Sequence, residues 1–487
     1  MLAAVITELK DIPKAKDADL AELRLDYIKN INNAKLKNLM QNCRKPVIVT
    51  NRKKSECGFF NGNENKRIET LKNALELGAD YVDVEYSSDK KSIRDLIHNK
   101  RKTKIIVSYH DFEKTPGDIN KIYVRIKKLN PDFIKIVTNA RSVADNFRIF
   151  DLIRKANKEK RKIIAFCMGD YGKFSRILSI IFGSQITYAS ISKRKESASG
   201  QLTINEMVGH YRIKKINKNT KIVGLIGNPV EHSWSHIMHN AAFDAFDINA
   251  VYLKFRVDRL KEFIDYFRKL NIMGFAVTVP HKIKVMECLD EIDRQAKEIG
   301  AVNTIVSKNG RLVGCNTDCH GAIRALKAKT RLKNKNAIVL GAGGTARAIA
   351  YGLKEEKSNI IILNRTAEKA KKLADYFNCD YGSLEHLKNI DYDILINATS
   401  VGMHPNIGSS PVPPDCIKNG AVVFDAVFNP YKTKLLKIAE KKGCTVIPGI
   451  EMLIYGNMMQ FRLWTNRDLP ESVMKKMIVV YAKNASN

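Results

Sequence analysis

KNAIVLGAGGTARAIAYGL (residues 335–353) decides the fold of the second half of this chain. An apolar run, a glycine-rich turn and an amphipathic stretch follow one another, in the strand–turn–helix order of a dinucleotide-binding unit. The glycines allow a tight turn and the close approach of a pyrophosphate, which the first turn of the helix then faces. We therefore predict a parallel sheet that binds a dinucleotide at six residues: Gly341, Ala342, Gly343, Gly344, Thr345 and Ala346.

The next predicted strand, NIIILNRT (359–366), indicates which nicotinamide cofactor is bound. It ends without the acidic residue that binds the ribose of NAD, and Asn364, Arg365 and Thr366 stand there instead. A guanidinium suits the 2′-phosphate of NADP, so we predict a Rossmann domain that binds NADP through these residues. A solvated arginine in a surface loop is the alternative. Two more residues complete the predicted cofactor site: Thr399 in ILINATSVGM (394–403) and Gly449 in GIEML (449–453).

The first half of the chain alternates short apolar runs with amphipathic stretches. Eight runs lie at residues 3–7, 21–26, 46–51, 81–86, 104–110, 133–138, 162–168 and 186–191. Buried strands that alternate with helices indicate a parallel sheet, and eight of them indicate a (β/α)8 TIM barrel, an α/β fold. We predict a barrel (1–215), a substrate-binding domain (220–321), a Rossmann domain (322–450) and C-terminal helices (451–487) that pack back on the substrate-binding domain, with a polar linker at 211–221.

The composition favours a cytoplasmic enzyme. No apolar run reaches the roughly 20 residues of a membrane helix, and the first residues lack a secretory signal. The nine cysteines are scattered without a CxxC pair, which argues against a metal site or a disulfide framework. The net charge of +32 is compatible with a polyanion partner, but the lysines are spread along the chain. We predict small-molecule substrates and no specific nucleic acid or membrane partner; the oligomeric state stays open.

Polar residues follow the predicted barrel strands, at the end where such barrels carry their active sites. Lys135 lies within the run FIKIVT (133–138), so its side chain points into the barrel. Burial favours the neutral amine of a lysine, which is a nucleophile toward ketones. With His110 and Glu56, which end or follow other runs, it makes a coherent Schiff-base and proton-transfer site. The alternatives are a lysine paired with a buried carboxylate, a core histidine and a surface glutamate.

Residues 1–210 resemble type I 3-dehydroquinate dehydratase. The matching segments are ELRLD (22–26), RKKSECG (52–58), SYHDFEKTP (108–116), IKI around Lys135, MGDYGKFSR (168–176) and SASGQ (197–201). The resemblance implies that Lys135 forms an imine with the C3 ketone of 3-dehydroquinate. It implies that His110 moves the C2 proton to the departing C1 hydroxyl and that Glu56 orients His110. The implied substrate-binding residues are Arg176 for the carboxylate, with Glu22, Arg24, Arg52, Ser197 and Gln201. Cys57 departs from the family, which usually has glycine there.

Four clusters of turn-forming residues precede the glycine-rich turn: GNPVEHSWSH (227–236), AVTVPHK (276–282), GAVNT (300–304) and GCNTDCHG (314–321). Each alone is ordinary turn chemistry. As a set, with the NADP turn and GIEML, they resemble shikimate dehydrogenase over about residues 221–487, and most of all its plant-type fused form. The resemblance implies a catalytic pair, Lys282 and Asp318, in which Lys282 serves proton transfer to the C3 oxygen as NADPH delivers hydride. The implied substrate-binding residues are Ser233, Ser235, Thr278, Asn303, Asp318 and Tyr431.

Two residues depart from the dehydrogenase pattern. Gly456 stands where the family usually has a glutamine that touches the substrate, and Ala276 stands where many members have asparagine. Asn457 or Gln460 could substitute for the glutamine, but a helix would present them elsewhere. The leading hypothesis is therefore a bifunctional enzyme that needs NADP and no metal. The alternatives are a second half that prefers quinate or a related polyol acid, a regulatory pseudo-enzyme and a nucleic-acid-binding protein.

Overall fold

The computed structural model describes residues 1–473 and divides into two compact units. The first consists of Met1–Ile222 with Phe243–Tyr266, and the second of Val223–Ala242 with the chain from Phe267 onward. The division of the sequence into four segments stays a prediction, and residues 474–487 of its last segment lie outside the described residues. Within residues 1–473, no helix is long and apolar enough to cross a membrane.

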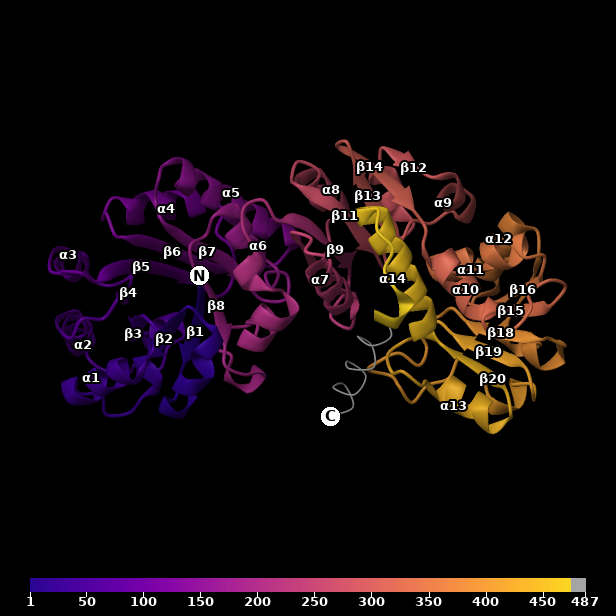
Figure 1. Cartoon of the computed structure of the whole chain (residues 1–487), viewed down its shortest axis with the longest axis horizontal. Coiled ribbons are helices and arrows are strands. Elements are labelled where there is room, and N and C mark those ends of the chain that lie inside the picture. The colour runs from indigo at the N-terminus through magenta and orange to yellow at the C-terminus, as the bar shows by residue number, and fades with distance from the viewer. Residues whose placement is uncertain (474–487) are drawn as a thin grey trace. The chain divides into compact units, whose positions relative to one another are not determined.

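The first unit contains a parallel eight-stranded sheet that curls into a nearly closed barrel, with helices outside it (Figure 1). The strands are β1 (Leu2–Ile6), β2 (Leu20–Arg24), β3 (Val47–Thr50), β4 (Tyr81–Glu85), β5 (Lys104–Asp111), β6 (Phe133–Asn139), β7 (Ile163–Met168) and β8 (Thr187–Ser190). The helices are α1 (Asn33–Asn42), α2 (Glu64–Glu76), α3 (Lys90–His98), α4 (Ile119–Lys127), α5 (Val143–Lys158) and α6 (Ser175–Phe182). Each predicted apolar run coincides with one strand, which confirms the predicted barrel.

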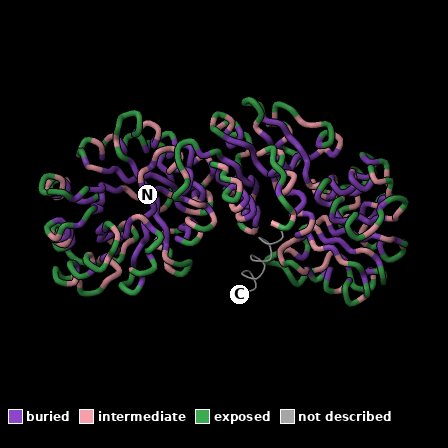
Figure 2. The backbone as a smooth tube through the Cα atoms, in the orientation of Figure 1, coloured by how far each residue is buried: buried purple, intermediate pink, exposed green. Residues whose placement is uncertain are grey.

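The barrel strands are buried on both faces, since the helices cover one face and the barrel interior the other (Figure 2). Side chains alternate between the two faces along each strand. On β6, Phe133 and Val137 belong to the interior core, so Lys135 between them also points inward. On β4, Tyr81 belongs to the interior core, so Asp83 and Glu85, two and four residues later, also point inward. The period of two therefore brings charged residues of several strands into one interior.

The second half begins with a mixed six-stranded sheet in the order β10-β9-β11-β13-β14-β12. Its strands are β9 (Lys221–Gly227), β10 (Ala250–Arg256), β11 (Ile272–Val277), β12 (Glu291–Ile292), β13 (Thr304–Lys308) and β14 (Arg311–Cys315). Its helices are α7 (Ser235–Ala245), α8 (Leu260–Phe267), α9 (Arg294–Ile299) and α10 (Asp318–Lys327). β13 pairs antiparallel with β11 and with β14, so the loops that follow β11 and β14 come to the same edge as the start of β13.

A parallel six-stranded sheet follows in the order β17-β16-β15-β18-β19-β20. Its strands are β15 (Asn336–Leu340), β16 (Asn359–Leu363), β17 (Asp380–Gly382), β18 (Ile394–Asn397), β19 (Val422–Asp425) and β20 (Thr445–Pro448). Its helices are α11 (Gly344–Glu355), α12 (Ala367–Phe377), α13 (Lys434–Lys441) and the long α14 (Gly449–Thr465). The order reverses beside β15, at the crevice where such sheets bind dinucleotides, and the predicted Rossmann fold is confirmed.

Helix α14 packs closely against α10 because of a glycine. A Cβ atom on Gly321 would lie 2.5 Å from the carbonyl oxygen of Met452 and 3.1 Å from the backbone nitrogen of Gly456. Only glycine allows the two backbones to approach this far. The contact aligns the start of α10, which carries Asp318, with the face of α14 that carries Gly456.

Residues 243–266 belong to the first unit, together with the barrel. The ring of Tyr266 stacks on Phe147 of α5 at 4.1 Å between centroids, and its hydroxyl donates to Asp151 at 2.9 Å. Arg256 pairs with Asp170, which follows β7, at 3.2 Å. Phe255 contacts Phe174 in the same β7–α6 segment at 4.8 Å. The compact unit around the barrel therefore extends beyond the predicted linker.

Candidate active sites

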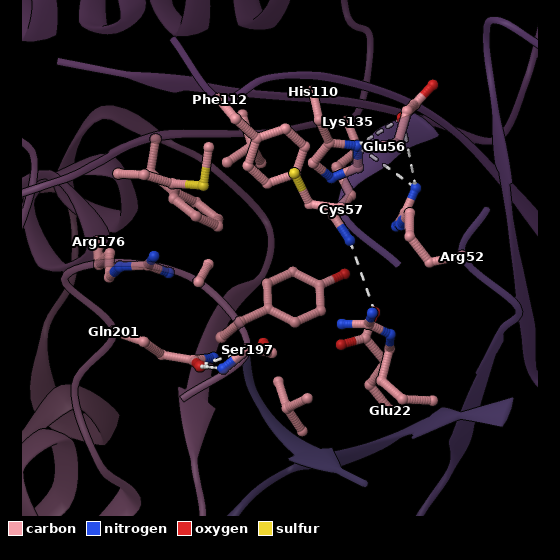
Figure 3. A pocket seen from close by; sticks show the side chains of 17 residues that line it. Glu22, Arg52, Glu56, Cys57, His110, Phe112, Lys135, Arg176, Ser197 and Gln201 are labelled. Carbon is pink, nitrogen blue, oxygen red and sulfur yellow. Dashed lines mark hydrogen bonds and ion pairs between the residues drawn. The ribbon is translucent and has the colours of Figure 1, made fainter. Parts of the chain in front are cut away.

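The barrel interior opens into a pocket at the carboxyl ends of its strands (Figure 3). Nine residues predicted from sequence line it: Glu22, Arg24, Arg52, Glu56, His110, Lys135, Arg176, Ser197 and Gln201. They come from six strands or the loops after them, because the parallel barrel directs all these ends to one face. Side chains of Val5, Phe112, Val137, Phe166, Met168 and Tyr188 supply the apolar walls.

Lys135 is buried and paired with an aspartate that the sequence reading did not single out. Its Nζ donates to Asp83 at 2.8 Å and lies 3.7 Å from Glu22. Burial opposes the ionisation of Asp83, but the charges of Arg52 and Lys135 outweigh it and hold the pKa of Asp83 well below its usual range. Lys135 is therefore paired with a buried carboxylate and also lines the pocket, so the two interpretations of this lysine are compatible.

His110 and Glu56 form a base and its orienting carboxylate. His110 Nδ1 lies 3.1 Å from Glu56 Oε2, and Ser87 also donates to the Glu56 carboxylate. Since a carboxylate accepts, Nδ1 carries the proton and Nε2 keeps its lone pair. Burial and the charges of Arg52 and Lys135 lower the pKa of His110 to about 4, against the opposing effect of Glu56. His110 is therefore a neutral base over the physiological range.

Arg52 lies between the Lys135–Asp83 pair and the His110–Glu56 pair. Its guanidinium donates to Ser108 Oγ at 2.9 Å and to Asp83 at 3.2 Å, and Ser108 donates to Asp83 at 2.6 Å. Arg52 also lies 3.3 Å from His110 Nδ1 and 3.4 Å from Glu85. Because Ser108 and the carboxylates accept from it, the imidazole proton stays directed at Glu56. The acidic residues at alternate positions of YVDVEY (81–86) were the sequence feature that could have predicted this network.

Arg176 is a buried cation that has no ion pair within 4 Å among the residues that the structure describes, although the charge of Glu196 acts on it. Its Nε donates to the carbonyl of Gly200 at 3.1 Å, and its guanidinium lies 4.6 Å from the ring centroid of Phe166. Burial lowers its pKa to about 10, so it remains charged at neutral pH. Figure 3 shows it across the pocket from Arg52 and Glu56. A buried cation of this kind is suited to bind an anionic group of a ligand.

The remaining predicted residues of this pocket are held by local contacts. Arg24 pairs with Asp26 through two hydrogen bonds of 2.9 and 2.7 Å. Gln201 Oε1 accepts from the backbone and side chain of Ser197, which fixes the side-chain amide. Cys57 has a left-handed backbone with φ of 55°, which explains why glycine suits this position.

A second pocket lies in the second unit, between the two sheets of the dehydrogenase half. Nine of the predicted residues line it: Ser233, Ser235, Thr278, Lys282, Asn303, Asp318, Thr345, Thr399 and Gly449. Tyr431 does not line it and is 48% exposed. Gly341, Ala342, Gly343, Gly344 and Ala346 form the turn beside it, and Asn364, Arg365 and Thr366 follow β16 outside it.

Lys282 and Asp318 face each other in this pocket. Lys282 Nζ donates to Asp318 Oδ2, and to Thr345 Oγ1 of the glycine-rich turn at 3.1 Å. Asn303 donates to Asp318 Oδ1 at 2.8 Å. Asn316 Oδ1 accepts from the backbone nitrogen of Asp318 at 3.0 Å and thereby caps the start of α10. The carboxylate is fixed by its neighbours, and the lysine lies at the junction of the substrate lobe and the nucleotide turn.

The glycine-rich turn and the loop after β16 fit NADP. A Cβ atom on Gly343 would meet nothing within 4 Å, so this backbone is open to a close ligand. The first amides of α11 follow directly and suit a pyrophosphate. Arg365 is exposed and has no acidic partner among residues 1–473, and no acidic residue stands at the end of β16. A 2′-phosphate would meet a free guanidinium there.

The departures from the family pattern also lie in the second pocket. Gly456 and Ala276 both line it, and a Cβ atom on Gly456 would lie 3.6 Å from the nearest atom, the carbonyl oxygen of Thr317. Asn457 bonds to His239 at 2.9 Å, and Gln460 donates to Thr304 at 3.0 Å. Both amides also line the pocket, and both are engaged in hydrogen bonds within the protein.

A barrel with a buried lysine at its centre, followed by a dinucleotide-binding dehydrogenase fold, defines a chain of two enzyme folds in tandem. The sequence matches the family described as type I 3-dehydroquinase over residues 1–218. It matches the shikimate dehydrogenase substrate binding domain over residues 225–305 and the shikimate/quinate 5-dehydrogenase family over residues 324–412.

Named relatives cover both halves. The chain is 38% identical over 487 aligned residues to the chloroplastic bifunctional 3-dehydroquinate dehydratase/shikimate dehydrogenase of Arabidopsis thaliana, covering 95% of this chain and 80% of the relative. The chain belongs to this bifunctional family. Its second half is 46% identical to the NADP(+) shikimate dehydrogenase of Methanocaldococcus jannaschii, covering 54% of this chain and 98% of that one.

Solved structures agree for the second half. A crystal structure of a shikimate dehydrogenase in complex with NADP+ has a TM-score of 0.53 and 45% identity, covering 55% of this chain and 97% of that chain. The shikimate 5-dehydrogenase of Thermus thermophilus, in complex with NADP(H) and shikimate, has a TM-score of 0.50 and 34% identity, covering 53% and 98%.

Proposed function

We propose that the chain catalyses two consecutive reactions: dehydration of 3-dehydroquinate to 3-dehydroshikimate in the barrel, and reduction of that product to shikimate in the second half. The observation that carries the first reaction is that Lys135 and Arg176 line the same pocket. The substrate has a ketone for the amine and a carboxylate for the buried guanidinium. Membership of the bifunctional family supports both steps.

The first step joins Lys135 to the substrate. The lysine amine, after loss of one proton from its ammonium, attacks C3, and the π electrons of the carbonyl move to its oxygen. That oxygen takes up two protons in all and leaves as water, and the nitrogen keeps a positive charge as a protonated imine. Ammonium plus ketone thus gives iminium plus water, with no net gain or loss of protons. Asp83, which stays ionised, stabilises the positive charge throughout.

The second step removes water across C1 and C2. The iminium withdraws electrons from C2, so its proton is transferred to Nε2 of His110 and the electron pair forms an enamine. Glu56, which accepts from Nδ1, stabilises the imidazolium that results. The enamine then returns its electrons, the C1 hydroxyl leaves with the proton from His110 as water, and C1 and C2 become doubly bonded. Hydrolysis of the iminium frees Lys135 and the product.

Borohydride trapping tests this assignment. Incubation with 3-dehydroquinate and borohydride should reduce the iminium and leave one covalent adduct on Lys135, detected by mass spectrometry of peptides. Lys135→Ala should give no adduct and no dehydratase turnover, with the dehydrogenase reaction intact as the control for folding. Full turnover in a wild-type protein that yields no adduct would exclude the Schiff-base route.

In the second half, bound NADPH supplies a hydride to the substrate ketone. The residues that would hold it are Gly341, Ala342, Gly343, Gly344, Thr345, Ala346, Asn364, Arg365, Thr366, Thr399 and Gly449. Lys282 would donate a proton from Nζ to the C3 oxygen, and Asp318 would hold that ammonium and accept from a substrate hydroxyl. Ser233, Ser235, Thr278 and Asn303 would bind the substrate carboxylate and hydroxyls, whereas Tyr431 does not line the pocket.

A matched pair of variants tests this half. Lys282→Ala should lower NADP-linked oxidation of shikimate by about a thousand-fold or more and leave the dehydratase reaction unchanged. Arg365→Ala should raise KM for NADP and leave KM for NAD unchanged, because only NADP carries the 2′-phosphate. Equal effects on both cofactors would contradict the assigned role of Arg365.

The second candidate function for this half is oxidation of quinate or a related polyol acid. Gly456 favours it, because the residue leaves room in the pocket where a longer side chain would reach the ligand. Quinate carries an additional hydroxyl at a tetrahedral C1 and needs more space than shikimate. A ratio of kcat/KM for quinate over shikimate above one would establish this alternative.

Two expectations from composition are part of the proposal. We place the protein in the cytoplasm, with small molecules as its ligands and neither nucleic acid nor a membrane as a partner. Retention on DNA or RNA that falls steeply with salt would contradict the second expectation.

A further inference from the structure

Tyr188 lines the dehydratase pocket but has no assigned role. It lies on β8 (Thr187–Ser190), points into the barrel core and is 4% exposed. Its hydroxyl oxygen is buried and has no hydrogen-bond partner among residues 1–473. Leaving a buried hydroxyl unpaired costs about 1–3 kcal/mol, so such groups usually have a partner in the working state of a protein.

The ring of Tyr188 lies between the two cations of the pocket. Lys135 Nζ is 4.2 Å from its centroid, close enough for a cation–π interaction. The ring also lies near Phe166, with 6.1 Å between centroids, and the guanidinium of Arg176 lies over the Phe166 ring. The two aromatic rings thus line the same pocket as the nucleophile and the proposed carboxylate anchor.

The hydroxyl can act only as a neutral group. Burial raises the pKa of Tyr188 well above its usual value, and the carboxylates of Glu22 and Asp83 raise it further. The phenol therefore keeps its proton at every working pH, and it offers a donor rather than a base. Since Nζ lies over the ring, the hydroxyl is within reach of the atoms bonded to the carbon that Lys135 attacks.

We propose that Tyr188 is a further catalytic residue of the dehydratase, whose hydroxyl donates a hydrogen bond to the C3 oxygen of the substrate while Lys135 attacks. The inference rests on the proposed Schiff-base function. In that step the nitrogen–carbon bond forms, the carbonyl π pair moves to the oxygen, and the hydrogen bond from Tyr188 stabilises the negative charge that develops there. The ring then faces the nitrogen, which is positive both as the ammonium and as the iminium.

Tyr188→Phe tests the hydroxyl alone. It should lower kcat of the dehydratase by about ten- to a hundred-fold and slow the formation of the borohydride-trapped adduct to the same extent. The thermal midpoint should be unchanged or raised, because an unpaired buried hydroxyl is removed. Dehydrogenase activity of the same molecules should stay at the wild-type level and serves as the control for concentration and folding.

Tyr81→Phe is the matched control, since Tyr81 belongs to the same barrel core but does not line the pocket. It should leave dehydratase kcat unchanged. Tyr188→Leu, which also removes the ring, should slow trapping several-fold beyond Tyr188→Phe.

If the Tyr188→Phe variant has the same dehydratase kcat and the same trapping rate as the wild-type protein, the inference is overturned. A fall in activity accompanied by a lower thermal midpoint would also overturn it, because the hydroxyl would then have a structural partner. These outcomes are separate from failure of the proposed function itself, in which wild-type protein would give no adduct at Lys135.

Discussion

Both pockets place a lysine against an aspartate, yet the two pairs have different surroundings. Lys135 and Asp83 have side chains at most 5% exposed, and Asp83 also accepts from Arg52 and Ser108. Lys282 and Asp318 are 14% and 16% exposed and lie in the cleft beside the nucleotide turn. The buried pair is part of a charge network that also includes Arg52 and Glu22. The pair in the cleft is partly accessible to solvent.

A lysine–aspartate pair does not define a reaction by itself. In the barrel, the neighbours include a neutral base and a second buried cation, so covalent chemistry on a ketone acid is supported. In the second half, the neighbours are hydroxyl and amide groups and a dinucleotide turn, so the lysine is suited to proton transfer.

The largest expected effect is that of Asp83→Asn. It removes the charge that balances Arg52 and Lys135 in the interior, and breaking a buried ion pair costs about 3–5 kcal/mol. We expect dehydratase activity to fall about a thousand-fold or more, and the thermal midpoint of the barrel to fall by about 6–20 °C. Calorimetry of the full chain and assays of both reactions would measure this. Asp318→Asn is the comparison variant and should abolish only the dehydrogenase, with the smaller loss of stability. Equal losses of stability would remove the distinction between the pairs.

Arg176→Met should have the next largest effect. It removes the buried cation proposed for the substrate carboxylate, and a charged hydrogen-bonded pair contributes about 2–3 kcal/mol. KM for 3-dehydroquinate should rise about thirty- to a hundred-fold, with a smaller change in kcat. Arg176→Lys should recover part of this loss, because it restores the charge without the bidentate geometry. Unchanged KM in both variants would mean that the carboxylate binds elsewhere.

The pH profile gives a third test. Because the pKa of His110 is lowered to about 4, kcat/KM of the dehydratase should be constant above about pH 5 and fall by half near pH 4. Glu56→Gln removes a group that raises this pKa, so it should move the midpoint to lower pH. An unfolded histidine takes up its proton near pH 6.5. The free energy of unfolding should therefore decrease as the pH falls from about 6.5 to about 4 and be independent of this group above that range. A kinetic midpoint at about 6.5 would contradict the effect of burial.

Gly456→Gln should have the smallest effect. If shikimate is the substrate, the added amide should lower KM for shikimate about three- to ten-fold, as one hydrogen bond would. Gly456→Ala is the control, since it gives the same gain in helix propensity without the amide. A rise in KM for shikimate, together with loss of quinate oxidation, would show instead that the space at Gly456 is used by a larger ligand.

The sequence predicted the barrel and the Rossmann sheet because both follow from periodicity and glycine placement. It also predicted nine residues of each pocket, since parallel strands bring their ends together. It did not predict the partners of these residues. Asp83 was hidden inside an apolar run, and the unpaired hydroxyl of Tyr188 is a property of its neighbours rather than of its position in the chain. Tyr431 is the opposite case. The resemblance places it in the substrate cleft, but in the structure it is 48% exposed and does not line the pocket.

The contacts of residues 243–266 with the barrel have a consequence for the history of such genes. Arg212, at the start of the predicted linker, pairs with Asp244 at 3.2 Å and donates to the carbonyl of Ala250 at 2.8 Å. A gene fission at the linker codons would remove Tyr266 from Phe147 and Phe255 from Phe174, and would expose part of both rings. An exposed patch of this kind promotes aggregation. Once fused, the two reading frames are therefore easier to keep together than to separate.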